Sequence, residues 1–188
     1  MRDQSVLVTG GAGATGGFTI NALTKFDVSI RTLVRKDDVR AQRLRVAGVE
    51  VVIGDLLDVD SVRWAMEGIS AAYFVYPLVP GLIDATAYFA QAAREAGLKG
   101  IVNMSQISAR RDSRSHQARD HWISESVFDW SGVPVTYLRP TFFAQWLTYP
   151  PVRNGLFAGT NDVIETITGT APMTVQSFVK AHKAELSG

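Results

Sequence analysis

The chain has 188 residues, the size of one domain or of one domain with a small appendage. Its 46% hydrophobic and 20% charged residues are typical of a globular protein, and a net charge of +1 gives no reason to expect nucleic acid or a membrane surface as a partner. The absence of cysteine excludes disulfides, thiolate catalysis and zinc sites that need thiolate ligands.

The first predicted element is a buried strand at residues 5–9, which leads directly into the glycine-rich stretch 10–17. A helical pattern follows at about residues 14–26. Glycine permits a tight turn and a close approach of backbone to a ligand, and a helix N-terminus offers unpaired N–H groups to a pyrophosphate. This strand–turn–helix order predicts a dinucleotide site at the first strand–helix junction. The cofactor-binding residues expected here are Gly10, Gly13, Ala14, Thr15 and Gly16.

Strand-like and helical segments then alternate with short connections. The expected strands are residues 28–34, 49–53, 71–75, 100–104 and 134–138, and the expected helices between them are residues 39–47, 59–67, 83–96 and 119–130. Gly48, Gly68, Gly97 and Gly132 stand where helices should end, and the candidate caps for the third helix are Asp58 and Asp60–Ser61. Apolar strands separated by helices predict an α/β fold, a Rossmann-type doubly wound parallel sheet with the strand order 3-2-1-4-5-6.

The end of the second strand bears on the choice between NAD and NADP. In Rossmann proteins an acidic residue at this point binds the ribose 2′-OH, whereas an arginine pairs with the 2′-phosphate. Arg35 stands at the strand end and Lys36 follows it, so the sequence favours NADP(H) over NAD(H). Asp37 and Asp38 are placed as a helix cap and a dipole partner. In the alternative interpretation, Arg35, Lys36, Arg40, Arg43 and Arg45 form a solvated face of the following helix.

Ligands of open parallel sheets bind outside the carboxyl ends of the strands. Asp55, at the end of the third strand, is expected either to bond the adenine or to serve only the turn. Tyr76 and Pro77 are expected to wall the ribose–nicotinamide side, with packing beneath the loop as the alternative for Tyr76. The other residues expected at the cofactor are Leu56, Ser105, His121, Pro140 and Phe143.

His121 and Glu125 are the candidate catalytic residues. They are four apart on one predicted helix, so the carboxylate could orient the imidazole, which could position the nicotinamide or pass a proton. The alternative is a solvated pair that supports the helix.

Other sites and locations find less support. The histidine and acidic residues match no metal-ligand spacing, so we expect no metal. We also expect no nucleic-acid binding, because acidic residues interrupt the arginine cluster of residues 110–119. The most apolar stretch, residues 71–83, contains two prolines and is too short to span a bilayer. Residues 1–4 leave no room for a signal peptide, so a cytoplasmic location is expected.

Taken together, these motifs resemble the NmrA-like family of atypical short-chain dehydrogenases over about residues 5–148. The residues that carry the resemblance are Thr9, Gly10, Gly13 and Gly16, Leu33 to Arg35, Gly54 and Asp55, Ser131 to Pro134, Leu138 to Pro140 and Phe143. The resemblance implies a Rossmann domain that binds NADP(H) or NAD(H). Members include quinone reductases, triphenylmethane-dye reductases, isoflavone-type reductases and catalytically silent redox sensors.

The sequence departs from the wider superfamily at the position of its Tyr-x-x-x-Lys pair. Alignment on Glu125 puts Gln117 and His121 in the Tyr and Lys places, so the usual proton donor is absent. The His-x-x-x-Glu pattern is similar to the quinone-reductase-like branch, in which hydride passes directly to an electrophilic acceptor. Trp146 stands where the family has an asparagine.

We therefore expect residues 1–148 to form an NAD(P)-binding domain and residues 149–188 a short extension that remains of the family's substrate-binding lobe. Thr174 is a candidate cap for a last helix at residues 175–186. The expected function is an NADPH-dependent oxidoreductase for small aromatic or quinone-like acceptors, stacked on an aromatic wall of Tyr76, Phe142, Phe143 and Trp146. The alternative is a non-catalytic NADP(H) sensor, and a homodimer is compatible with the fold.

Overall fold

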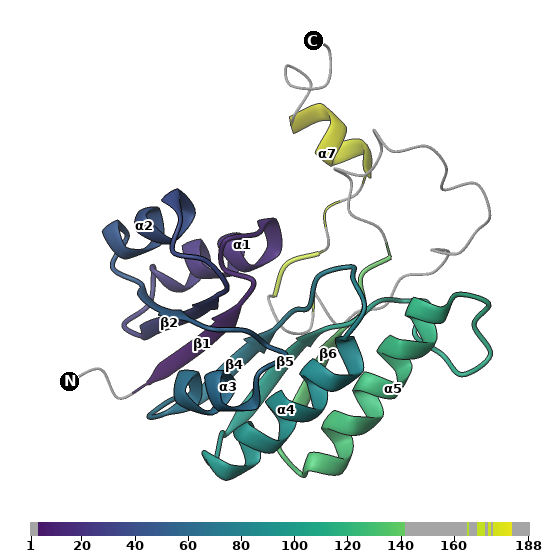
Figure 1. Cartoon of the computed structure of the whole chain (residues 1–188). Helices are drawn as coiled ribbons and strands as arrows, with labels where there is room; N and C mark the ends of the chain where they lie inside the picture. The colour runs from purple at the N-terminus through teal and green to yellow at the C-terminus, as the bar shows by residue number, and fades with distance from the viewer. Residues whose placement is uncertain (1–3, 142–164, 166–168, 172, 174, 182–188) are drawn as a thin grey trace.

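The computed structural model describes residues 4–141, 165, 169–171, 173 and 175–181. Six parallel strands form one sheet in the order β3-β2-β1-β4-β5-β6, which confirms the predicted Rossmann topology (Figure 1). The strands are β1 (Ser5–Thr9), β2 (Ser29–Val34), β3 (Glu50–Ile53), β4 (Ala71–Phe74), β5 (Gly100–Met104) and β6 (Val135–Leu138). The helices are α1 (Ala14–Leu23), α2 (Val39–Val46), α3 (Val59–Met66), α4 (Leu82–Glu95), α5 (His116–Ser131) and α7 (Val175–Ala181).

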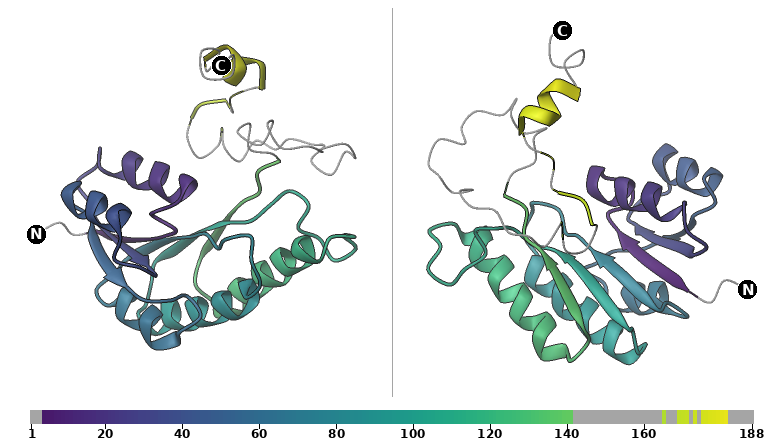
Figure 2. Two further views of the ribbon diagram at one scale, coloured as in Figure 1. Left: turned by 45° about the horizontal axis from the view of Figure 1, so that its top comes forward. Right: turned by 180° about the vertical axis from the view of Figure 1, so that it is seen from behind.

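Two apolar layers enclose the sheet, because neighbouring residues of each buried strand point to opposite faces. Figure 2 shows α1 and α2 on one side of the sheet and α3, α4 and α5 on the other. The larger layer holds a triangle of aromatic rings in which Phe74 lies 4.7 Å from Phe89 and 5.2 Å from Phe128, centroid to centroid. The smaller layer joins Val8 and Tyr73 of the sheet to Ile20 of α1.

The helix boundaries agree with the predictions to within a few residues. Of the candidate caps for α3, Asp58 is the N-cap, while Asp60 and Ser61 lie inside the helix. The four glycines predicted to end helices all have positive φ angles. Helix α1 ends at Leu23, before the predicted end, since the apolar Phe26 is 65% exposed and belongs to the following turn. Helix α5 begins at His116, before the predicted start, because Ser115 caps it by accepting a hydrogen bond from the backbone N–H of Ala118.

The last predicted helix is present as α7, while residues 182–186 and its candidate cap Thr174 lie outside the described residues. The expected aromatic-wall residues Phe142, Phe143 and Trp146 also lie outside them. Within the described part of the chain, the helices fall short of the length and apolar content needed to span a bilayer.

Candidate functional site

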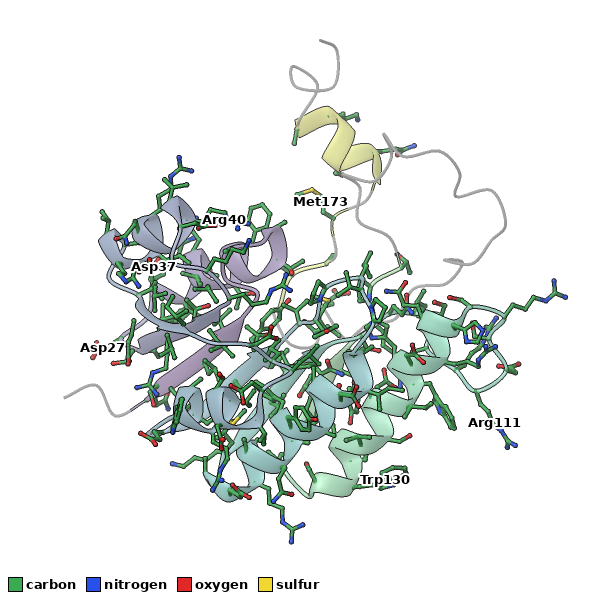
Figure 3. All side chains as sticks on the ribbon, viewed as in Figure 1. Asp27, Asp37, Arg40, Arg111, Trp130 and Met173 are labelled. Carbon is green, nitrogen blue, oxygen red and sulfur yellow. The ribbon has the colours of Figure 1, made fainter. Side chains whose placement is uncertain are left out.

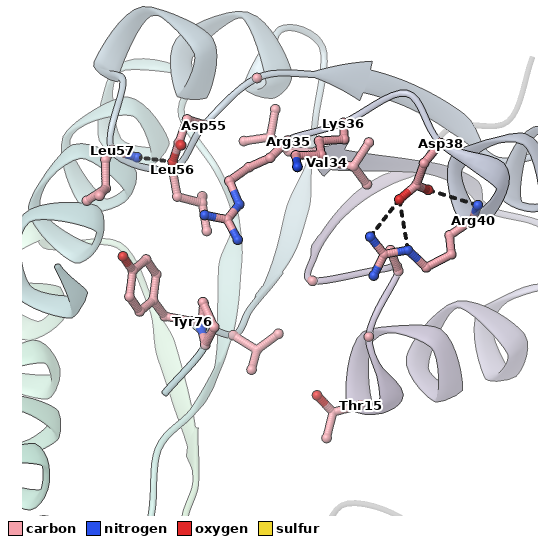
Figure 4. A pocket seen from close by; sticks show the side chains of 17 residues that line it. Thr15, Val34, Arg35, Lys36, Asp38, Arg40, Asp55, Leu56, Leu57 and Tyr76 are labelled. Atoms are coloured by element: carbon pink, nitrogen blue, oxygen red, sulfur yellow. Dashed lines mark hydrogen bonds and ion pairs between the residues drawn. The ribbon is translucent and has the colours of Figure 1, made fainter. Parts of the chain in front are cut away.

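A cleft of about 490 Å³ opens at the carboxyl ends of β1 to β4 (Figure 4). It lies where the chain changes direction across the sheet, since β1 pairs with β2 on one side and with β4 on the other. This switch point is the usual ligand position in doubly wound sheets. The residues that line it are Gly10, Ala12, Gly13, Thr15, Leu33, Val34, Arg35, Lys36, Asp38, Arg40, Gly54, Asp55, Leu56, Leu57, Val75, Tyr76 and Pro77.

The glycine-rich loop forms one wall of the cleft and is pressed tightly against α1. Gly10 has a φ of +63°, and its carbonyl accepts a hydrogen bond of 2.8 Å from the N–H of Gly13. A Cβ atom on Gly16 would overlap the carbonyl oxygen of Gly10. Gly13 caps α1 without a side-chain hydrogen bond, so the N–H groups of the first turn are available to an anion.

Thr9, the last residue of β1, fixes the backbone of Val75, a residue that lines the cleft. Backbone pairing between β1 and β4 ends at Val8 and Tyr73. Beyond that pair, the Thr9 hydroxyl donates to the carbonyl of Val75 at 2.9 Å and accepts from its N–H at 2.8 Å. This fully buried side chain therefore holds the two strand ends together beneath the glycine-rich loop.

A cationic end of the cleft is formed by residues after β2. Arg35 and Lys36 are exposed, and neither is in an ion pair within the described residues. Arg40 also lines the cleft, but Asp38 holds its guanidinium through Nε at 3.0 Å and Nη2 at 2.6 Å. The cations that the alternative interpretation places on one solvated helix face therefore fall into two groups. Arg35, Lys36 and Arg40 line the cleft, whereas Arg45 is paired with Asp37.

Asp38 caps α2, as predicted. Its Oδ1 accepts hydrogen bonds from the backbone N–H groups of Arg40 and Ala41, at 2.9 and 3.3 Å. The Arg40 guanidinium, together with these N–H groups, lowers the pKa of the Asp38 carboxyl to about 2. Asp38 therefore carries a full negative charge in the cleft at neutral pH.

Asp55 and Tyr76 lie at the opposite end of the cleft from Arg40 (Figure 4), and each also has a structural role. Asp55 accepts a hydrogen bond of 3.0 Å from the N–H of Leu57, so it serves the turn after β3 as well as lining the cleft. The Tyr76 hydroxyl donates to the carbonyl of Pro80 at 2.9 Å. Burial raises the pKa of Tyr76, and the nearby carboxylate of Asp55 raises it further.

Ser105, His121 and Pro140 lie outside this lining, at the carboxyl ends of β5 and β6 and on α5. Ser105 and His121 are buried, and within the described residues neither the Ser105 hydroxyl nor Nδ1 of His121 has a hydrogen-bond partner. An unpaired buried polar group is unfavourable.

The sequence predicts that the carboxylate of Glu125 orients the imidazole of His121. This prediction is wrong, because the carboxylate is hydrogen-bonded to a different residue. Both oxygens of Glu125 accept hydrogen bonds from Arg139, at the end of β6, one of them from Nε at 2.9 Å. The alternative of a solvated pair is also wrong, because His121 and Glu125 are both buried. A guanidinium binds a carboxylate through two parallel bonds, and it therefore outcompetes the neighbouring imidazole for Glu125.

Burial lowers the pKa of His121, although the nearby carboxylates of Glu125 and Asp120 oppose the shift. The folded state therefore disfavours the protonated ring. The pKa of histidine in the unfolded chain is about 6.5, so below this pH the unfolded chain binds the proton more tightly than the folded protein does. We expect the free energy of unfolding to fall between about pH 7 and pH 5 by up to about 1.4 kcal/mol per pH unit.

Urea unfolding across this pH range tests this expectation with two variants of α5. His121→Gln should flatten the pH profile, whereas His116→Gln, which changes an exposed histidine on the same helix, should keep the wild-type slope. Equal slopes for all three proteins would contradict the assignment to His121.

The structure brings together most of the residues predicted to bind the cofactor. Those in the cleft are Gly10, Gly13, Thr15, Arg35, Asp55, Leu56, Tyr76 and Pro77. Ala14 and Gly16 lie next to the lining in the first turn of α1. Asp38 and Arg40 were not assigned to the cofactor site from the sequence. A signal was present: Asp38 is the N-cap of the helix that follows β2, so the first turn of that helix, which contains Arg40, lies at the same edge of the sheet as the end of β2.

The described residues also include histidine, acidic and arginine side chains outside the cleft. Within the described residues, no three histidine or acidic side chains are grouped to hold a metal ion. Arg119, in the first turn of α5, donates to the carbonyl of Ser113 in the loop before this helix and also contacts His116. Figure 3 shows Arg111 at the outer end of this loop, on the opposite side of the molecule from Arg40.

Comparison with known proteins places this fold and cleft in a family. The sequence profile of the NmrA-like family matches residues 2–180. The NAD(P)H azoreductase of Xenophilus azovorans is 32% identical over 142 residues, which are 74% of this chain and 49% of the azoreductase.

Two solved structures with named activities share the fold. The triphenylmethane reductase of Citrobacter sp., complexed with NADP(H), is 28% identical with a TM-score of 0.67; the alignment covers 76% of this chain and 51% of that one. The NADPH-dependent quinone oxidoreductase of Escherichia coli is 26% identical with a TM-score of 0.68, at the same coverage. The chain thus spans about half the length of these proteins. It belongs to the NmrA-like family.

Proposed function

We propose that this chain binds NADP(H) in the cleft and forms the cofactor domain of an NADPH-dependent oxidoreductase that reduces flat, conjugated acceptors such as quinones or azo compounds. One observation carries the proposal: the glycine-rich loop and the start of α1 lie at the switch point of the sheet, in the same cleft as Arg35 and Lys36. The names of the three relatives support the acceptor class, because azo, triphenylmethane and quinone compounds all contain an electrophilic conjugated system.

In this proposal the pyrophosphate is bound by the first turn of α1, and Arg35 and Lys36 bind the 2′-phosphate. Asp55 and Leu56 contact the adenine. The residues assigned to the nicotinamide side are Tyr76, Pro77, Ser105, His121, Pro140 and Phe143, the last of which lies outside the described residues.

NADPH, when bound, supplies the hydride. His121 is neutral near pH 7, because burial lowers its pKa, so its ring can donate a hydrogen bond to the acceptor without carrying charge. Little acid catalysis is needed for a quinone, since its reduced anion is already stable. Glu125 acts as a positioning residue in this proposal: through Arg139 it fixes α5, which carries His121, against the end of β6.

The test is a spectrophotometric assay of NADPH consumption with a panel of quinones, azo dyes and triphenylmethane dyes, repeated with NADH. We expect loss of reduced cofactor that depends on the acceptor and is faster with NADPH. Binding of NADPH without turnover would favour the sensor alternative, which the glutamine at position 117 supports. Failure to bind either nucleotide would overturn the proposal.

His121→Ala should lower the turnover number about tenfold, less than the hundredfold or more of an essential general acid, because the product anion is stable without a proton. The KM for NADPH should change little. His116→Ala, on the exposed first turn of α5, is the matched control and should keep the wild-type rate. A variant at position 121 with unchanged kinetics would remove the histidine from the mechanism.

A further inference from the structure

The two oxygens of the Asp38 carboxylate have different roles, one in the helix cap and the other in the cleft. Oδ1 accepts the backbone N–H groups of Arg40 and Ala41 and caps α2. Among the described residues, Oδ2 accepts only from the Arg40 guanidinium, at 3.0 and 2.6 Å. The bond to the guanidinium can therefore be broken while the helix cap remains in place.

The three cations that line the cleft differ in their surroundings. Figure 4 shows Arg35 extending toward Leu56 and Tyr76, while the Arg40 side chain turns back toward Asp38. Asp38 neutralises Arg40, whereas Arg35 and Lys36 have no such partner in the described residues. An anion that binds at the guanidinium of Arg40 therefore meets the carboxylate of Asp38, while Arg35 extends away from this pair.

We propose that Asp38 limits the preference of this cleft for the 2′-phosphate of NADP(H), and that the phosphate binds by taking the place of Oδ2 on the guanidinium of Arg40. This inference rests on the proposed function, in that it requires a dinucleotide in the cleft. Phosphate oxygens suit the Nε–Nη2 edge of a guanidinium as well as a carboxylate oxygen does.

The exchange is favoured by the exposure of the ion pair. The side chain of Arg40 is 59% exposed and that of Asp38 is 33% exposed, so the attraction between them is screened by water. The displaced carboxylate keeps its charge at neutral pH and repels the phosphate that has replaced it. Removal of this carboxylate should therefore strengthen phosphate binding.

The experiment uses Asp38→Ser, because serine keeps an oxygen for the helix cap but is too short to reach the guanidinium. Calorimetric titrations at low salt compare adenosine 2′,5′-bisphosphate with adenosine 5′-monophosphate. The variant should bind the bisphosphate about three- to tenfold more tightly, the order expected for removal of one nearby exposed charge. Its affinity for the monophosphate should stay close to that of the wild type.

Two further variants separate the proposed exchange from a general effect of charge. Asp37→Ser makes the same charge change at the adjacent residue, which pairs with Arg45 and does not line the cleft, and it should leave the affinity ratio unchanged. In Asp38→Ser/Arg40→Gln, the gain should disappear.

An unchanged or lower preference for the bisphosphate in Asp38→Ser, or an equal gain in Asp37→Ser, would overturn the inference while nucleotide binding by the wild type upheld the cofactor site. A wild-type protein that bound neither nucleotide would overturn both.

Discussion

Replacement of Gly16 by alanine should abolish detectable nucleotide binding and destabilise the fold by about 2–3 kcal/mol, the upper range for an overpacked site. The new methyl group would overlap the backbone of Gly10, which cannot move aside as a flexible side chain can. The glycine-rich loop must shift instead, and a displacement of about 1 Å in a binding loop can lower function about a hundredfold.

Gly17→Ala is the matched control for this prediction, because it makes the same change one residue later in α1. A Cβ atom there would lie 3.5 Å from the carbonyl oxygen of Gly11, an ordinary contact. This variant should keep nucleotide affinity and gain up to about 1 kcal/mol from the higher helix propensity of alanine. Urea unfolding and NADPH titration measure both effects. Equal behaviour of the two variants would mean that the loop does not depend on Gly16.

Arg139→Met should destabilise the protein by about 2–3 kcal/mol, somewhat less than the loss of a partner from a fully buried ion pair. The Glu125 side chain is only 5% exposed, so this substitution leaves its carboxylate buried without a cation. Arg139 itself is 43% exposed, which moderates the expected loss. Urea unfolding at pH 7 measures the change.

The double variant Glu125→Leu/Arg139→Met should recover most of the lost stability, since an apolar pair of similar volume leaves no buried charge unpaired. A double variant as unstable as Arg139→Met would show that the ion pair itself is not the source of the effect. The same protein also tests the role of Glu125 in the reaction. Turnover close to that of the wild type would exclude a direct chemical role for this carboxylate and leave it a positioning residue.

The glycine-rich loop could be predicted from the sequence, whereas the pairing of Glu125 with Arg139 could not. The strand order and the glycine-rich loop follow from local patterns: apolar strands, helices between them, and glycines at a fixed spacing. The Asp38 and Asp58 caps are equally local, since each side chain bonds N–H groups two or three residues ahead. Predictions of this kind were confirmed.

The partner of Glu125 could not be predicted in this way. Helical spacing brings His121 close to Glu125, but Arg139 approaches from a strand 14 residues further along the chain. Its position depends on how β6 packs against α5, which no local pattern encodes. Arg40 was missed for a related reason: a run of cations on a helix does not reveal which of them faces a cleft. Residues 142–164, to which the aromatic wall was largely assigned, lie outside the described structure.

The hydroxyl of Thr9 has a consequence for how the cleft discriminates one end of a ligand from the other. By pairing with both backbone groups of Val75, which lines the cleft, it leaves no unpaired backbone donor or acceptor at that residue. Unpaired N–H groups are then offered from one wall, at the start of α1. The groups that attract an anion therefore lie at two places, the start of α1 and the cationic residues after β2, while the backbone of Val75 offers none. An elongated anion is favoured in the orientation that brings its charged groups to those two places.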